Sequence, residues 1–231
     1  MVIANSIFDS PWVAVTVVLL VIGGFAYGYF FSKKIVLLRE MRKSKSQTIG
    51  RAQEGKYTKI VGKAKHVTEP MLAPISKRPC IFYHITVIQG SGKNRRTIID
   101  DMQVQDFFIE KDGEMAMVKM DQPPTFRNVV LVEDHQYDSG IFKNPSEHVE
   151  KYLNKHGKDS KYWLGFNKDL KYWEGIIGID EIIAVKGIAE WKSLKNPIEG
   201  YHYSKILSLR GSKDKKLLIT DHKRALKDPK S

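Results

Sequence analysis

The feature that most constrains this chain is an uncharged run of 20 residues near its N-terminus, residues 12–31. As a helix, a run of this length would measure roughly 30 Å, about the hydrocarbon thickness of a bilayer. Trp12 stands at one end and aromatic residues crowd the other, which is typical of interfacial belts. No basic residue precedes Lys33, which argues against a cleaved signal peptide. The run predicts one transmembrane helix over 12–31, after a short flank, 1–11.

A basic segment, 32–47, follows the predicted helix. It carries the six basic residues Lys33, Lys34, Arg39, Arg42, Lys43 and Lys45. Positive residues remain on the cytoplasmic side, so the pattern predicts an external N-terminus and a cytoplasmic domain. The six residues are candidates for a contact with anionic membrane lipid, at about 1 kcal/mol per basic residue near the surface. The alternative is a plain continuation of the anchor helix with a charge cluster that stops transfer.

Two glycines of the predicted helix, Gly24 and Gly28, form a small-xxx-small pair. Such pairs let two helices approach closely. They are candidate helix-packing residues for a homodimer, against the alternative that glycine is simply common in membrane helices.

The rest of the chain, 48–228, reads as one mainly β (α+β) domain, with a tail at 229–231. Short runs rich in β-branched and aromatic residues alternate with turn residues. We expect eight or nine short strands in a barrel-like or sandwich sheet, with one or two helices. The expected strands are 56–67, 80–89, 97–110 (bent near 100–101), 114–120, 128–132, 170–177, 181–191, and a hairpin of 204–210 with 215–220. One helix is expected over 148–156, between a capped N-terminus at 144–147 and Gly157.

Two of the expected strands carry a similar glycine. Gly62 follows a valine and precedes Ala64, and Gly187 lies in the same kind of setting before Ala189. Glycine inside a strand marks a bulge or a barrel bend. The pattern therefore favours a barrel-like sheet without establishing a repeat.

No catalytic, cofactor or metal constellation is found. Cys80 is the only cysteine, which excludes an internal disulfide and any zinc site made of several thiolates. His84 lies four residues along the same strand, roughly 13 Å away by strand rise and too far for a hydrogen bond. Cys80 is therefore interpreted as a small buried hydrophobic residue. We expect no enzyme activity from this chain alone.

The net charge of +12 raises the question of nucleic acid. Much of the basic density lies in 32–47, where lipid accounts for it, and no recognition helix or aromatic-basic signature is found. We expect no nucleic-acid partner.

The stretch Pro74-Ile-Ser-Lys-Arg78-Pro79-Cys80-Ile-Phe-Tyr83 resembles the "P-L-S-x-R-P-C-x-Y-Y" motif of the GIDE or BAM ("beside a membrane") domain, as found in the mitochondrial-anchored ubiquitin and SUMO ligase. Three further stretches fit in order: 62–70, 172–189 and 217–221. The resemblance implies that seven residues have structural or binding roles: Pro74, Arg78, Pro79, Cys80, Tyr83, Glu174 and Gly187.

The chain departs from those ligases in two respects. It lacks their second membrane helix, and it lacks their RING finger, whose two zinc sites a single cysteine cannot build. The resemblance therefore implies a short, RING-less, prokaryotic-type member: a membrane-anchored module that recognises an unidentified protein partner or substrate. The alternatives are a non-RING component of a ubiquitin-ligase-like or protease complex, and a lipid-interface scaffold. The resemblance also raises a non-cytosolic location as the alternative topology.

Overall fold

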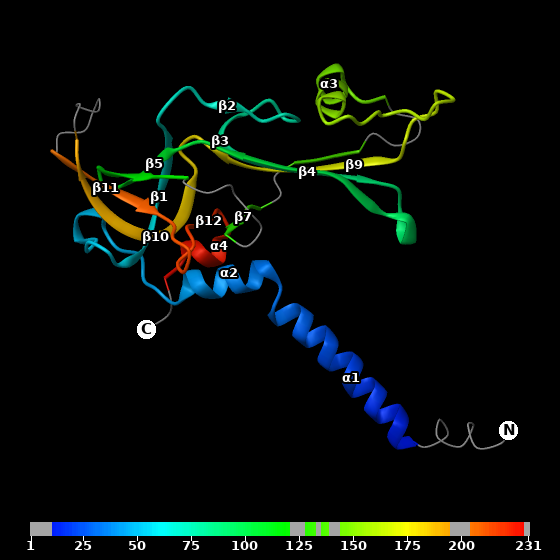
Figure 1. The fold of residues 1–231 in the computed structure, drawn as a ribbon, viewed down its shortest axis with the longest axis horizontal. Coiled ribbons are helices and arrows are strands. Elements are labelled where there is room, and N and C mark those ends of the chain that lie inside the picture. The colour runs from blue at the N-terminus through cyan, green and yellow to red at the C-terminus, as the bar shows by residue number, and fades with distance from the viewer. Residues whose placement is uncertain (1–10, 121–127, 133–134, 139–143, 195–203, 229–231) are drawn as a thin grey trace.

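The computed structural model describes residues 11–120, 128–132, 135–138, 144–194 and 204–228. Within these ranges the chain forms twelve strands and four α-helices, arranged as a barrel and an open sheet side by side (Figure 1). The mainly β prediction is confirmed, although the strands and helices outnumber those expected.

Five strands close into a barrel. They are β1 (Tyr57–His66), β5 (Phe107–Lys111), β6 (Glu114–Val118), β11 (Lys205–Arg210) and β10 (Ile182–Ser193). Each strand pairs with the next in that order, and β10 pairs back onto β1 to complete the circuit. All of these contacts are antiparallel except that between β6 and β11. Two further strands extend the sheet beyond β10, namely β12 (Leu218–Thr220) and β7 (Val129–Val130).

The barrel bends where the sequence places its two strand glycines. Next to Gly62, at Lys63, the pairing of β1 with β10 ends and its pairing with β5 begins. A Cβ at Gly62 would collide with the backbone carbonyl of Glu110, and one at Gly187 would meet Leu217 and the carbonyl of Arg210 at 2.9 and 3.0 Å. Both glycines therefore allow a neighbouring segment to approach closely, as expected for a bent barrel strand.

The open sheet is built around the best strand of the sequence, β3 (Pro79–Gln89). Its other strands are β2 (Met71–Leu72), β4 (Arg96–Val104), β9 (Leu170–Gly178) and β8 (His135–Asp138). Helix α3 (Glu147–Lys155) packs Val149 and Leu153 against one face of this sheet. Gly157 takes φ +64° after the helix, as a C-terminal glycine does.

One hydrophobic core joins the two sheets. Ile81, Phe82 and Ile177 belong to the open sheet, yet they pack with the barrel interior. Alternate residues of β3, such as Tyr83 and Ile85, face the second cluster under α3. Because β3 is buried on both faces, its sequence is almost continuously apolar.

Two strand predictions are wrong in detail. Residues 97–110 form two strands, β4 and β5, because the chain breaks at residues 105–106 and enters the other sheet. Residues 204–220 do not form a hairpin, since β11 and β12 each pair with β10 and not with each other.

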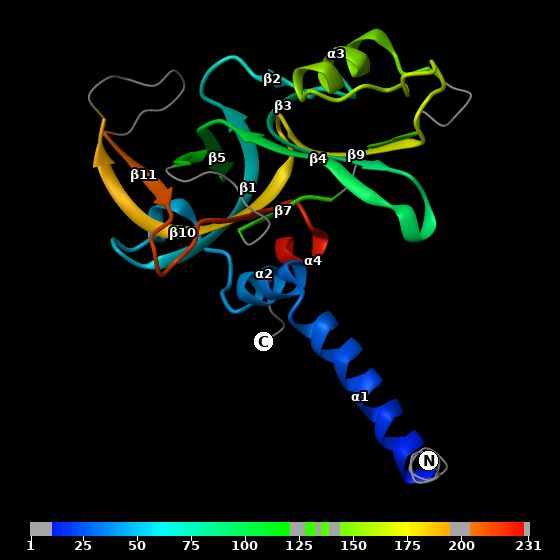
Figure 2. The ribbon, with the colours of Figure 1, turned by 45° about the vertical axis from the view of Figure 1, so that its right-hand side comes forward.

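The N-terminal region forms two helices rather than one. Helix α1 (Pro11–Phe30) extends away from the β structure, and α2 (Lys33–Arg42) turns back beneath the barrel beside α4 (Lys223–Leu226) (Figures 1 and 2). Ser32 separates α1 from α2, and its hydroxyl accepts from the backbone N–H of Ile35. The segment 32–47 is therefore not a continuation of the first helix.

The prediction of a membrane-spanning anchor is contradicted. Helix α1 has 20 residues, but no helix within the part of the chain that the structure describes is both long enough and apolar enough to cross a bilayer. The prediction relied on the length of the uncharged run 12–31 and on the aromatic residues at its two ends. The transmembrane part of the fold class and the single-pass localisation, with either orientation, are therefore withdrawn.

Candidate functional site: a pocket between α2, β1 and the β11–β12 loop

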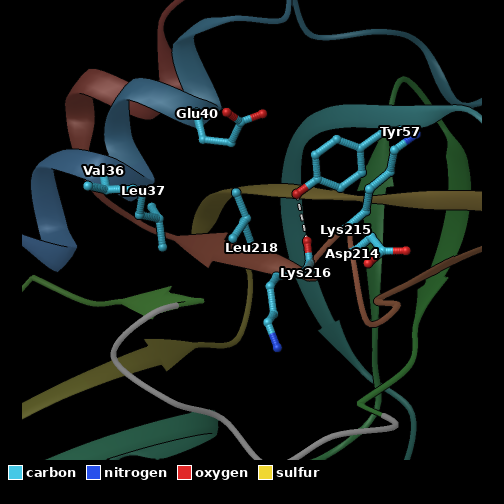
Figure 3. A pocket seen from close by; sticks show the side chains of 8 residues that line it. All are labelled: Val36, Leu37, Glu40, Tyr57, Asp214, Lys215, Lys216 and Leu218. Carbon is cyan, nitrogen blue, oxygen red and sulfur yellow. Dashed lines mark hydrogen bonds between the residues drawn. The ribbon is translucent and has the colours of Figure 1, made fainter.

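A pocket of about 400 Å³ lies where the N-terminal and C-terminal parts of the domain meet (Figure 3). Its lining comes from α2, the start of β1, and the segment between β11 and β12. The lining residues are Val36, Leu37, Glu40, Tyr57, Asp214, Lys215, Lys216 and Leu218. This volume is within the range of small-ligand pockets.

Helix α2 is fixed by its apolar side. Leu37, Leu38 and Met41 are buried against Ala184 of β10 and Ala225 of α4. Val36 remains half exposed at 45% and faces the pocket instead. The apolar side of α2 therefore covers the barrel and leaves only its edge at the pocket.

The wall of the pocket contains a buried ion pair. Lys186 of β10 is only 2% exposed, and its Nζ donates to both the carbonyl and Oε1 of Glu40 at 2.9 Å. Lys43 lies 2.6 Å from the other carboxylate oxygen. Burial alone would raise the pKa of Glu40, but the hydrogen bonds from Lys43 and Lys186 hold that pKa below its usual value. Glu40 therefore carries its charge at neutral pH.

Tyr57 forms the aromatic side of the pocket. The Nζ of Lys186 lies 4.7 Å from the centre of its ring, and the Nζ of Lys215 lies 5.9 Å from it. The Tyr57 hydroxyl donates to the carbonyl of Lys216 at 2.6 Å. Burial, followed by the charge of Glu40, raises the pKa of Tyr57, so the phenol remains protonated and its ring stays fixed to the loop.

The loop after β11 is held in a tight turn. Ser212 donates its N–H to the carbonyl of Lys215, and the N–H of Lys215 donates to the Ser212 hydroxyl. A Cβ at Gly211 would lie 2.9 Å from the backbone N of Leu217. The turn presents the exposed Lys215 and Lys216 at the rim.

A second buried lysine lies beside the first. Lys59 of β1 is directly opposite Lys186 in the strand register and has no exposed area. Its Nζ donates to the carbonyl of Lys227 at 3.3 Å and lies 3.7 Å from Asp228. Burial lowers the pKa of Lys59, and Asp228 opposes that shift. Glu40 of α2 is thus the partner of the buried Lys186, and Lys227 and Asp228, which follow α4, are the partners of the buried Lys59.

The polar groups in the walls of the pocket are already engaged with one another. Glu40 is paired with two lysines, and the Tyr57 hydroxyl is bonded to a carbonyl. What faces the open space is an apolar floor, formed by Leu37 and Leu218, with a rim of lysines. Such a surface suits an apolar group that is accompanied by a negative charge.

The residues of the GIDE/BAM-like stretch lie elsewhere, in a loop fixed by Glu174. The carboxylate of Glu174 is fully buried and accepts the N–H groups of Ile75 and Ser76 at 2.8 and 3.0 Å. Lys77 takes a left-handed conformation, and the N–H of Ala73 donates to the carbonyl of Arg78. These contacts give the stretch from Pro74 to Pro79 a structural explanation.

Cys80 and Tyr83 follow on β3, where both are buried. Burial, with the nearby charge of Glu174, raises the pKa of the Cys80 thiol to about 11. His84 is bonded to Asp100 at 2.9 Å and not to Cys80. The interpretation of Cys80 as a small buried hydrophobic residue agrees with this position.

Tyr83 belongs to a polar cluster that the sequence did not reveal. Its hydroxyl and that of Tyr152 donate to Asp101 at 3.3 and 3.0 Å. Burial, with the charge of Asp101 next in importance, raises the pKa of both tyrosines. His156 lies 3.5 Å from the same carboxylate but without the geometry of a hydrogen bond. The cluster fixes α3 to the open sheet.

The other predicted residues lie apart from the pocket or at its edge. Lys34, Arg39, Arg42 and Lys45 are exposed, Lys43 is paired with Glu40, and the side chain of Lys33 lies outside the described set. Gly24 and Gly28 lie on α1, where a Cβ would meet no atom within 4 Å. Their lipid-binding and helix-packing roles stay predictions.

No group of three or more His, Cys, Asp or Glu side chains suited to a metal ion occurs among the residues that can be described. The comparisons with known proteins are equally silent. No protein-family model matches the chain, and neither a curated protein nor a solved structure matches it. The resemblance to the GIDE/BAM domain thus stays a prediction.

Sequence reasoning missed the pocket because its parts are distant in the chain. Tyr57, Lys186 and Lys215 are brought together only by barrel closure and by the return of the chain end. A usable signal was present in Lys186, which is the only lysine inside the predicted strand 181–191.

Proposed function

We propose that this chain is a non-enzymatic recognition module that holds a segment of a partner protein in the pocket between α2, β1 and the β11–β12 loop. The partner would insert one apolar side chain beside Tyr57, and a carboxylate next to it would meet Lys215 or Lys216. The observation that carries the proposal is the pocket itself, whose apolar floor and cationic rim lie between fixed walls.

The electrostatics support this choice of partner. Two acidic residues line the pocket. Glu40 is already neutralised by Lys43 and Lys186, and Asp214 is exposed on the rim. Three exposed lysines, Lys213, Lys215 and Lys216, flank Asp214, so the rim keeps a net positive charge. A bound carboxylate would therefore find cations that need not be removed from an existing buried pair. Apolar anchors in a pocket with a polar rim are the usual form of protein recognition.

The test is a selection of displayed peptides against the purified full chain, followed by affinity measurement on the selected peptide. We expect sequences with an apolar residue next to Asp or Glu. Val36→Glu and the pair Lys215→Glu with Lys216→Glu should each weaken binding by about tenfold or more, equivalent to roughly 1.4 kcal/mol.

The matched control is Val67→Glu. Val67 is 39% exposed, close to the 45% of Val36, but it follows the opposite end of β1 from Tyr57. Equal losses in Val36→Glu and Val67→Glu, or selected peptides that bind all variants alike, would refute the pocket as the recognition site.

A further inference from the structure

A short turn beside α3 exposes four large apolar side chains in succession. Trp163 is 91% exposed, and Phe166, Leu164 and Tyr162 are 67%, 60% and 50% exposed. Apolar residues gathered in this way on a surface mark an interaction site more often than single exposed residues do. We call residues 160–168 the aromatic turn.

The aromatic turn is an ordered hairpin. Tyr162 donates its N–H to the carbonyl of Phe166, and Gly165 donates its N–H to the carbonyl of Tyr162, both at 2.8 Å. The N–H of Lys168 donates to the carbonyl of Ser160 at 2.7 Å. Gly165 adopts φ +85°, a conformation that favours glycine. Hydrogen bonds within the turn thus hold the backbone in the conformation that exposes these apolar side chains.

A second segment, far away in the sequence, lies against the aromatic turn. The amide of Gln89, at the end of β3, donates to the Tyr162 hydroxyl at 3.5 Å and accepts from Arg96 at 3.0 Å. Gln89 thus connects the base of the β3–β4 tip, residues 90–96, to the aromatic turn. This tip contains Lys93, Arg95 and Arg96, all exposed.

The two segments share a strongly positive charge. Residues 90–96 and 158–168 together contain six Lys or Arg and a single acidic residue, Asp159. Lys168 lies 5.8 Å from the centre of the Tyr162 ring and donates to the carbonyl of Asp159. The surface therefore combines bulky apolar tips with a surrounding set of cations.

We propose that the aromatic turn, together with the β3–β4 tip, binds an anionic lipid surface. Trp, Tyr, Phe and Leu side chains at a protruding turn enter the boundary between headgroups and acyl chains, and flanking Lys and Arg stay with the lipid phosphates. The contact is peripheral and needs no spanning helix. It also lies on different elements from the pocket, so it goes beyond the proposed function.

The single buried cysteine makes a direct test available. Cys80 has no exposed area and a raised pKa, so a cysteine introduced at the surface can be labelled selectively. We would label Leu164→Cys with an environment-sensitive NBD fluorophore and, as a matched control, Leu72→Cys. Leu72 is 61% exposed and Leu164 is 60% exposed, and the full chain is retained in both variants.

The labelled chains are mixed with vesicles of phosphatidylcholine alone or with added phosphatidylserine. We expect a blue shift and a severalfold gain in fluorescence for Leu164→Cys, only with phosphatidylserine, and no change for Leu72→Cys. Adding Lys161→Glu and Lys168→Glu should weaken the phosphatidylserine response by about tenfold or more, because two attractive charges become repulsive.

Three results would overturn the proposal. The first is no shift at Leu164→Cys, and the second is an equal shift at Leu72→Cys, which would show binding through another part of the chain such as α1. The third is a shift that appears only after a protein is added, which would assign the aromatic turn to a protein partner. Circular dichroism of each variant verifies that the fold is retained.

Discussion

A single carboxylate determines the shape of the most distinctive stretch of this sequence. Glu174 is fully buried and accepts two backbone N–H groups from the loop before β3. A buried charge is tolerated only when hydrogen bonds replace its hydration. The loop around Pro74 and Pro79 contains few N–H groups free to form a ladder, and Glu174 supplies the acceptors that a neighbouring strand would otherwise provide.

We predict that Glu174→Gln lowers the free energy of unfolding by about 1–3 kcal/mol. Each carboxylate oxygen accepts one N–H, and the amide NH2 that replaces one of the two oxygens donates and cannot accept. Urea unfolding followed by circular dichroism measures the change. Glu147→Gln, at an exposed carboxylate on α3, serves as the control and should leave the midpoint unchanged. Equal midpoints for the two variants would contradict the role of Glu174.

The buried thiol yields a second prediction at this scale. The pKa of Cys80 is raised to about 11, so the thiol is almost entirely protonated at neutral pH. We expect an alkylating reagent to modify Cys80 in the folded chain only as fast as the protein opens, and to modify it at once in denaturant. Rapid labelling of the folded chain at neutral pH would show that Cys80 is accessible.

Cys80→Ser should fold with a modest loss of stability from burying a hydroxyl.

At the scale of elements, the barrel depends on strands that bend and change partners. Gly62 lies where β1 passes from β10 to β5, and Gly187 lies where β10 is approached by Leu217. Neither position has room for a side chain without movement of the neighbouring backbone. The closed barrel thus requires residues without a Cβ at Gly62 and Gly187.

We predict that Gly62→Ala destabilises the protein by about 1–3 kcal/mol, because the new methyl group would collide with the carbonyl of Glu110. Gly178→Ala is the matched control, since a Cβ there would meet only Glu181 at an ordinary 3.7 Å. Thermal unfolding of both variants distinguishes them. If both alanines were tolerated equally, the close approach at Gly62 would not limit the barrel.

The sequence predicted the positions of the strands far better than it predicted which strands pair with each other. The strands at 56–67 and 80–89 were predicted nearly to their ends. β-Branched and aromatic residues dominate 80–89, and in 56–67 they form the run that surrounds Lys59. The hairpin expected over 204–220 failed because adjacent strands with a short turn usually pair, whereas here β10 separates β11 from β12. The aromatic turn was missed because its apolar residues lie outside any strand or helix.

At the scale of the whole molecule, the barrel and the open sheet share one core. Phe82 and Ile177 come from the open sheet but pack against barrel residues. Strands β9 and β10 are joined only by residues 179–181, so little chain separates the two halves. Each half would therefore expose part of the shared core if the other unfolded.

We predict a single cooperative unfolding transition. Trp173 lies on β9 in the open sheet, and Trp191 lies on β10 in the barrel, so each can report on one half. Two variants, each with the other three of the four tryptophans replaced by Phe so that only Trp173 or only Trp191 remains, should give coincident urea transitions. Separate midpoints would show that the halves are independent domains.

Barrel closure also has a consequence for how the chain is made. Tyr57 pairs with Ile188, so β1 leaves the ribosome long before its principal partner exists. Contacts this distant in sequence form slowly. During that interval the backbone of β1 is unpaired. The charges of Lys59, Lys63 and Lys65 discourage β1 from pairing with strands of other chains. Lys63 and Lys65 remain at least partly exposed in the folded barrel. Lys59 is buried, and its partners are Lys227 and Asp228. The yield of folded protein in cells should therefore depend on the pace of translation and on chaperones that shield a nascent strand.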